Sequence, residues 1–116
     1  MTFEEELQKW ETEFKRGFSK PFILLILAEK PNYPYQVTKT ILERTKGKIA
    51  IAGSNIYPVL KKMEDDGLIT GEKDGDSGKR YYSLTDRGKE FVILLKRSMK
   101  DFDEIIQEMI DVRGEL

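Results

Sequence analysis

AGSNIYPVLKKMEDDGLI, residues 52–69, contains the pattern of a helix followed by the start of a strand. Its apolar residues recur at steps of four and three, at Ile56, Leu60 and Met63. This spacing places them on one face of a helix. Ser54 is a candidate N-cap, and Gly67 is a typical helix-ending residue. Pro58 falls in or just beyond the first turn, where a missing amide is tolerated best. We therefore expect a helix from about Ser54 to Gly67.

The next residues predict a β-hairpin. Residues 68–73, LITGEK, and residues 79–84, KRYYSL, are short runs that can form strands. Between them lies DGDSG, a turn-forming sequence rich in Gly and Asp.

A long helix is predicted after the hairpin, with Thr85 as its N-cap and Asp86 in its first turn. Its apolar residues follow a heptad spacing, at Val92, Leu95, Met99, Phe102, Ile106 and Met109. Four further residues widen this apolar face: Phe91, Leu94, Ile105 and Ile110. So wide a face is seldom left in water, so we expect a partner subunit to cover it. The alternative is a helix that folds back over its own domain.

Three helices are predicted upstream. The first is amphipathic, with Phe3, Leu7, Trp10 and Phe14 on one face and Gly17 after it. The second begins at a Ser19 cap, with Pro21 in its first turn, and contains the apolar run 22–28. A strand is the alternative for that run. The third covers about residues 35–45, with inward side chains at Val37, Ile41 and Leu42.

This order of elements is typical of a winged helix-turn-helix with an added dimerisation arm. The expected fold class is mostly α with a small β-hairpin. We expect residues 1–84 to form the winged helix-turn-helix domain with its N-terminal helical extension. Residues 85–116 are expected to form a C-terminal dimerisation helix.

Composition argues against an enzyme. The 116 residues include no Cys and no His, which removes thiolate chemistry, the commonest general base and the commonest transition-metal ligand. The remaining candidate groups form no convincing catalytic pair, so we expect no catalytic residues, no cofactor and no metal site. The longest apolar run, residues 22–28, is far shorter than the roughly 20 residues that span a membrane. The acidic N-terminus is unlike a secretory signal, so we expect a cytoplasmic protein without membrane contact.

Charge is segmented along the chain, although the net charge is only −1. Residues 38–62 carry six bases and one acid, and residues 79–100 carry seven bases and two acids. Residues 1–14 and 101–116 are acidic. A basic middle could bind phosphates through one face despite the acidic ends. Ordinary solvated charge is the alternative interpretation.

Two motifs resemble those of the PadR-like transcriptional regulators. Residues 52–69 are similar to the family's recognition helix, and RYYSLTDRG, residues 80–88, is similar to its second wing strand leading into the last helix. The resemblance covers about residues 19–95 and implies a dimeric DNA-binding repressor whose activity responds to a small ligand or a stress. Pro34 stands where the family commonly has Gly, so the third helix is expected to begin differently. The long helix contains no Trp, so the aromatic drug-binding pore of one branch of the family cannot be carried over.

Candidate DNA contacts follow from the winged-helix geometry. Ser54 and Asn55 stand where a recognition helix enters the major groove, and Asn can pair with an adenine edge. For Ser54, a plain helix cap is the alternative. The other candidates are expected to reach the DNA backbone from this helix, the preceding helix and the base of the wing: Tyr57, Lys61, Tyr35, Gln36, Lys39, Lys79 and Arg80. The acidic wing tip, Asp74 and Asp76, is expected to point away from DNA.

The predicted partners are double-stranded DNA and a second copy of the chain. Residues of the last helix are expected to hold the dimer: Leu95, Met99, Phe102, Ile106 and Met109. Phe3, Leu7, Trp10 and Phe14 are expected to pack against that helix. A flat hydrophobic effector could bind at this interface, and a dry dimer core without ligand is the alternative. A protein-interaction module that does not bind specific DNA is the rival function.

Overall fold

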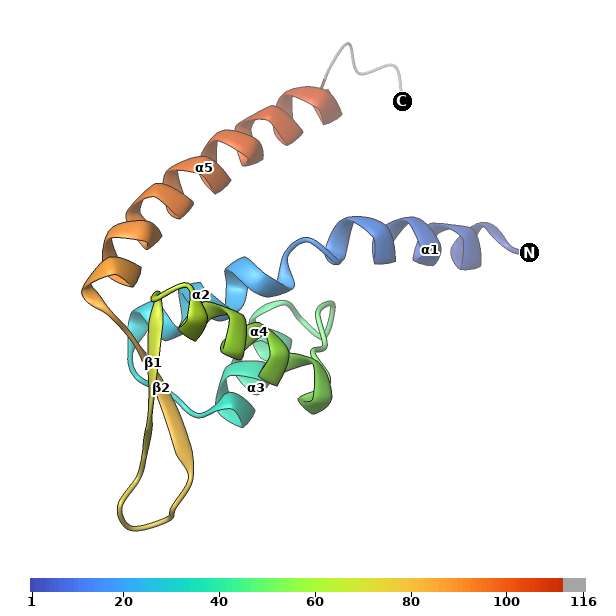
Figure 1. Ribbon diagram of the computed structural model, residues 1–116. Coiled ribbons are helices and arrows are strands. Elements are labelled where there is room, and N and C mark those ends of the chain that lie inside the picture. Colours follow the sequence, from blue (N-terminus) through green and yellow to red (C-terminus); the bar gives the residue numbers. More distant parts are fainter. Residues whose placement is uncertain (112–116) are drawn as a thin grey trace.

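The computed structural model describes residues 1–111, which form five helices and one two-stranded hairpin (Figure 1). The helices are α1 (Phe3–Lys15), α2 (Ser19–Glu29), α3 (Pro34–Arg44), α4 (Gly53–Asp65) and α5 (Asp86–Asp111). The strands are β1 (Ile69–Lys73) and β2 (Arg80–Leu84). The expected fold class is therefore confirmed. Residues 112–116 of the predicted C-terminal helix lie outside the described part of the chain.

The core lies where α2 packs against α3, α5 and the hairpin, and where α3 packs against α4. The apolar run of α2 is helical, as expected, and buries four side chains: Ile23, Leu24, Ile26 and Leu27. Ile56, Leu60 and Met63 are each 1% exposed, so the predicted inner face of α4 is confirmed. Val37 and Ile41 complete the core from α3. Leu42 was expected to point inward but is 40% exposed. It follows Ile41 directly in the helix, so its side chain is turned away from the buried face that Val37 and Ile41 share.

The hairpin, β1 and β2 with the turn between them, is called the wing below. Its strands pair in antiparallel register, with Ile69 opposite Leu84 and Lys73 opposite Arg80. The backbone of Asn32 adds a bridge to Tyr82, exchanging hydrogen bonds of 2.9 and 2.8 Å. The base of the wing is therefore joined to the segment that precedes α3.

The predicted cap of α5 is confirmed. Thr85 Oγ1 accepts a hydrogen bond of 3.0 Å from the Gly88 amide and donates one of 2.6 Å to the Gly67 carbonyl. One side chain thus caps α5 and ties its start to the end of α4.

Two other predicted caps are wrong. Ser19 is the first residue of α2, whose N-cap Phe18 already has helical dihedral angles. Ser54 lies inside α4, whose N-cap is Ala52. Neither helix has a side-chain hydrogen bond at its N-cap. Pro58 lies well inside α4 and supplies no amide to the carbonyl of Ser54 one turn earlier.

Helices α1 and α5 leave the domain on the side opposite to the wing turn (Figure 1). The beginning of α4, in green, lies on the same side of the domain as the wing turn. Along α1 and the outer part of α5 the large apolar side chains are exposed, including Phe3 at 93% and Met109 at 72%. The fold therefore separates a polar surface around α4 and the wing from an apolar surface on α1 and α5.

Candidate nucleic-acid interface

The first turns of α4 present the predicted base-reading residues to solvent. Ser54 and Asn55 are exposed, and Tyr57 is 58% exposed. They lie outside the buried face of α4, where Ile56 and Leu60 anchor the helix in the core. Backbone amides at a helix N-terminus attract phosphate, and short polar side chains there can approach base edges. Burial of the face with Ile56 and Leu60 thus leaves the candidate residues exposed to solvent.

The start of α3 lies next to the wing. Pro34 occupies the first helical position, where its fixed φ suits the helix and its missing amide has no cost. Tyr35 is 71% exposed, and Gln36 and Lys39 are also exposed. Tyr35 and Gln36 share a surface hollow of about 350 Å³ with Lys79 of the wing.

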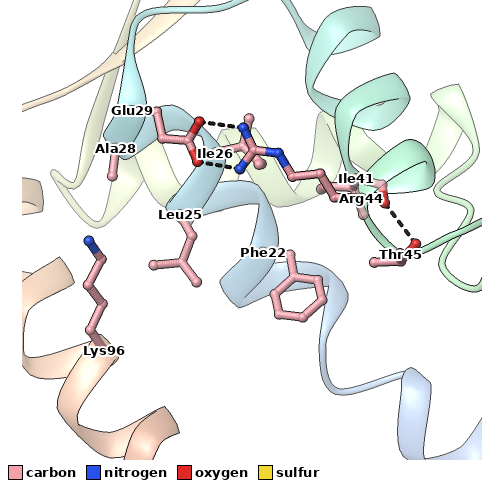
Figure 2. Close-up of a pocket in the computed structure, with 9 residues that line it drawn as sticks. All are labelled: Phe22, Leu25, Ile26, Ala28, Glu29, Ile41, Arg44, Thr45 and Lys96. Atoms are coloured by element: carbon pink, nitrogen blue, oxygen red, sulfur yellow. Dashed lines mark hydrogen bonds and ion pairs between the residues drawn. The ribbon is translucent and has the colours of Figure 1, made fainter.

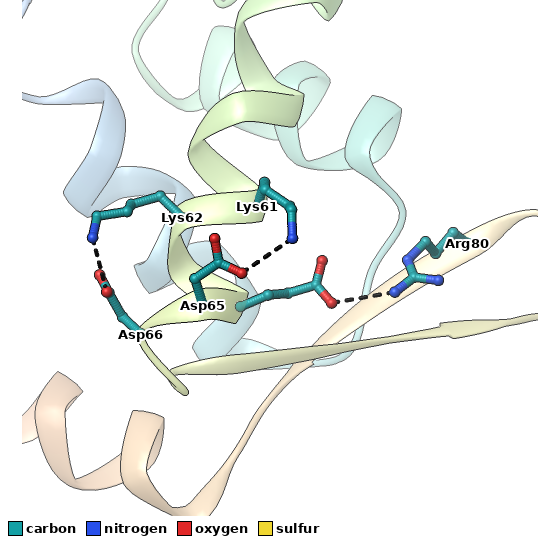
Figure 3. A network of polar contacts seen from close by, with 6 residues as sticks. Lys61, Lys62, Asp65, Asp66 and Arg80 are labelled. Atoms are coloured by element: carbon teal, nitrogen blue, oxygen red, sulfur yellow. Dashed lines mark hydrogen bonds and ion pairs between the residues drawn. The ribbon is translucent and has the colours of Figure 1, made fainter.

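Arg80 is turned toward α4 and away from the wing turn (Figure 3). Its Nη2 lies 3.2 Å from Glu64 Oε2, and its guanidinium lies 5.7 Å from the centre of the Tyr82 ring. Gly71 makes this possible, since a Cβ there would lie 2.6 Å from Arg80 Nε. Arg80 thus joins the wing to α4, and a contact with DNA would require it to leave Glu64.

The two lysines of α4 are paired with acids one turn later on the same helix (Figure 3). Lys61 Nζ lies 3.1 Å from Asp65 Oδ1, and Lys62 Nζ lies 3.0 Å from Asp66 Oδ1. Exposed pairs of this kind contribute about 0–1 kcal/mol, so a phosphate can compete with the carboxylate for the ammonium group. These pairs lower the positive charge of α4 but do not block access to Lys61.

A contact between Tyr33 and Asp74 joins the segment before α3 to the wing turn. Tyr33 OH donates a hydrogen bond of 2.6 Å to Asp74 Oδ2, and Asp74 Oδ1 accepts one of 2.9 Å from the Asp76 amide. The bond with Asp74 raises the pKa of Tyr33 above 10.0, and the same bond lowers the pKa of Asp74 below 3.8. This pair was not predicted, because no local sequence pattern relates residues 41 positions apart.

A second hollow, of about 430 Å³, lies among α2, α3 and α5 (Figure 2). Phe22, Leu25 and Ile41 form apolar walls, and Lys96 reaches in from α5. At its rim Arg44 makes two hydrogen bonds to Glu29, one of them 2.6 Å long. These bonds to Arg44 lower the pKa of Glu29 below 4.5. The pair joins the ends of α2 and α3 and was not predicted.

A third hollow, of about 660 Å³, lies between α2 and the outer part of α5. Its apolar lining consists of side chains from both helices: Phe18, Phe22, Leu25, Met99, Phe102 and Ile106. Three predicted dimer residues therefore line one cavity.

Comparison with known protein families gives a match that is consistent with this winged-helix fold. Residues 23–92 match the Transcriptional regulator PadR-like family. The chain belongs to this family. The matched residues run from the core of α2 to the start of α5, and include α4 and the whole wing. The resemblance of residues 52–69 and 80–88 to PadR-like motifs is thereby confirmed.

Individual relatives of this PadR-like chain agree with the family match. It is 31% identical over 94 residues to Uncharacterized protein X of Lysinibacillus sphaericus, covering 78% of this chain and 86% of that protein. It is 28% identical over 100 residues to Transcriptional regulator YqjI of Escherichia coli, covering 86% of this chain but only 46% of YqjI. A PadR family transcriptional regulator from Eggerthella lenta has the same fold, with a TM-score of 0.80, 21% identity and coverage of 95% and 96%.

Members of the PadR-like family are transcriptional regulators. Among residues 1–111, no helix is both long and apolar enough to cross a membrane.

Proposed function

We propose that this PadR-like chain is a transcriptional repressor that binds an inverted-repeat operator as a homodimer. The observation that carries the proposal is the exposed polar face of α4, with Ser54, Asn55 and Tyr57 on it. The start of α3 and the wing turn lie on the same side of the domain, where they can flank a DNA groove (Figure 1). In this assignment Asn55 reads a base edge, and Tyr57 and Lys61 contact phosphates.

Residues outside α4 extend the proposed contact. Tyr35, Gln36 and Lys39 of α3 and Lys79 of the wing are exposed, and the proposal assigns them to the flanking DNA backbone. Arg80 contributes by exchanging Glu64 for a phosphate or by holding the wing in place. Each phosphate contact raises affinity and also raises its dependence on salt.

Dimerisation is supported by the apolar surface of α1 and α5. The proposed contact residues of α1 are 57% to 93% exposed in the single chain: Phe3, Leu7, Trp10 and Phe14. On α5, Phe102, Ile106 and Met109 are 46% to 72% exposed, while Leu95 and Met99 are partly buried. Two such surfaces would cover each other in a dimer. An inverted repeat with half-sites on successive turns of DNA would require the two copies of α4 to lie roughly 34 Å apart.

The third hollow supports a role for a hydrophobic effector. A ligand seated between α2 and α5 would contact both the DNA-binding domain and the proposed dimer helix. It would shift the distance between the two copies of α4 if it binds one arrangement of the dimer more tightly than another. A repressor of this kind works in the cytoplasm, where it meets the chromosome.

Fluorescence anisotropy with two duplexes tests DNA binding. The protein is titrated against a duplex from its own promoter and against a scrambled duplex, each at two salt concentrations. The wild type is expected to prefer the promoter, with affinity that falls as salt rises. Asn55→Ala is expected to lose about 1–3 kcal/mol of discrimination between the duplexes. Lys61→Glu and Lys79→Glu are expected to weaken binding to both.

Lys9→Glu is the matched control for the two charge reversals, because Lys9 lies on α1, outside α3, α4 and the wing, and is not one of the proposed dimer contacts. It should leave both affinities within about twofold of wild type. Weak, salt-independent binding to both duplexes would contradict DNA recognition and favour a protein-interaction module.

A further inference from the structure

The orientation of the wing depends on its contacts with other elements. Two five-residue strands make a hairpin that is marginally stable in water by itself. The backbone bridge between Asn32 and Tyr82 holds the base of the wing. Beyond that point the wing extends from the domain (Figure 1). Its orientation toward DNA therefore depends on side-chain contacts with α4 and with the segment before α3.

The contact from Tyr33 to Asp74 reaches farthest along the wing. Asp74 is the first residue after β1, and its backbone closes the turn through bonds with Lys79 and Gly78 of 2.7 and 2.8 Å. Its side chain binds both the Asp76 amide and Tyr33 OH. One carboxylate thus organises the turn and connects it to the chain that leads into α3.

The ring of Tyr33 is itself fixed on two sides. Its centre lies 6.0 Å from that of Tyr81 on β2, in an edge-to-face arrangement. The Tyr33 amide donates a hydrogen bond of 2.9 Å to the side chain of Asn32. Pro34, which follows, has a fixed φ and begins α3. A rigid segment therefore carries the Tyr33 hydroxyl, which donates its hydrogen bond to Asp74.

We propose that Tyr33 and Asp74 are positioning residues that set the orientation of the wing relative to α3. This inference rests on the proposed DNA binding. It adds that the contact between Tyr33 and Asp74 holds Lys79 beside Tyr35 and Gln36. It also assigns a role to a carboxylate that would otherwise only repel phosphate. Neither residue need contact a base, because their effect on DNA passes through the wing.

Tyr33→Phe tests the proposal, with Tyr81→Phe as the matched control. Both changes remove one phenolic hydroxyl and keep both rings. Tyr81 OH donates its bond of 3.0 Å to Glu72 within the wing, so its loss leaves the wing attached to Tyr33. Binding to the promoter and scrambled duplexes is measured at several salt concentrations. Amide hydrogen exchange of residues 74–80 is measured in the free protein by NMR.

Tyr33→Phe is expected to accelerate exchange in the turn and to weaken promoter binding roughly three- to tenfold. The salt slope should fall by about one, as expected when one phosphate contact is lost. Tyr81→Phe should stay within about twofold of wild type in both measurements. Thermal unfolding of each variant separates a loosened wing from a loss of the whole fold.

Asp74→Asn distinguishes positioning from simple charge repulsion. If Asp74 acted only by repelling phosphate, Asp74→Asn would tighten binding to both duplexes and Tyr33→Phe would change nothing, which overturns the proposal. If Asp74 acts through Tyr33, Tyr33→Phe weakens DNA binding less in the Asp74→Asn variant than in the wild type. The reason is that Asp74→Asn has already weakened the acceptor of the Tyr33 hydrogen bond. A wild type that binds neither duplex contradicts the proposed function itself. A wild type that binds, with Tyr33→Phe equal to Tyr81→Phe, contradicts the positioning role alone.

Discussion

Gly88 of α5 packs directly against the backbone of Leu68, which lies between α4 and β1. A Cβ on Gly88 would lie 2.0 Å from the Leu68 carbonyl oxygen, a backbone atom that cannot rotate away. The approach is close because Thr85 binds both the Gly67 carbonyl and the Gly88 amide. Only glycine fits between this cap and the backbone that leads into β1.

Gly88→Ala is therefore expected to lower the free energy of unfolding by roughly 1–3 kcal/mol, because α5 must shift to relieve the overlap. Urea unfolding followed by circular dichroism measures the change. Gly17→Ala is the matched control, since a Cβ at Gly17 meets nothing within 4 Å. Equal stability of the two variants would contradict the close packing at Gly88.

The ion pair between Glu29 and Arg44 predicts a dependence of stability on pH. Because the pKa of Glu29 is lower in the folded protein than its ordinary value of 4.5, the unfolded chain takes up the proton first as pH falls. The contribution of Glu29 is thus fully present at neutral pH, declines near 4.5 and is lost below the folded pKa.

Glu29→Gln should consequently destabilise the protein at pH 7 and lose this difference from wild type as pH falls below 4.5. Urea unfolding of both proteins between pH 7 and pH 3 measures it. Both side chains are about half exposed, so the effect is expected to be small and to shrink with added salt. A difference that stays constant over this range would contradict the assignment.

At the scale of elements, α5 has two unlike faces. Phe102 lies on the broad apolar face and is 63% exposed. Ile93 is 56% exposed, and its position nine residues earlier, two and a half turns, places it on the opposite side of the helix. Both are large, apolar and accessible in the single chain, but only Phe102 continues the heptad spacing. Substitutions at these two residues therefore distinguish an effect on the dimer contact from a general effect of replacing an exposed apolar side chain.

Phe102→Asp is expected to convert a dimer of twice 13.5 kDa into a monomer, because it places a charge in the centre of the proposed contact. Light scattering coupled to size-exclusion chromatography measures the mass. Ile93→Asp should remain dimeric. Monomeric wild type, or dissociation by both variants alike, would contradict the assignment of the dimer surface to this face of α5.

At the scale of the whole molecule, the two kinds of surface lie on different sides. The beginning of α4 and the wing turn share one side with the start of α3, and α1 and α5 extend on the other (Figure 1). The molecule extends over 58 × 33 × 21 Å, which reflects these two projecting helices. A net charge of −1 is compatible with DNA binding, because the acidic residues 1–14 belong to α1 and the chain before it, outside α3, α4 and the wing.

The sequence by itself determined the order of the elements and the buried face of most helices. Apolar spacing of three and four residues identified Ile56, Leu60 and Met63, because side chains at these spacings share a face of any helix. It also identified Thr85 as a cap. It failed at Ser19 and Ser54, because the residue that precedes each helix is set by backbone dihedral angles and not by the availability of a hydroxyl.

Only the tertiary structure decided which distant side chains meet. Tyr33 and Asp74 are 41 residues apart, Glu64 and Arg80 are 16 apart, and Glu29 and Arg44 are 15 apart. Each contact depends on how one element packs against another, whereas periodicity relates only neighbours within one element. The wing's orientation, and with it the proposed placing of Lys79 near DNA, is therefore a property of the packed fold.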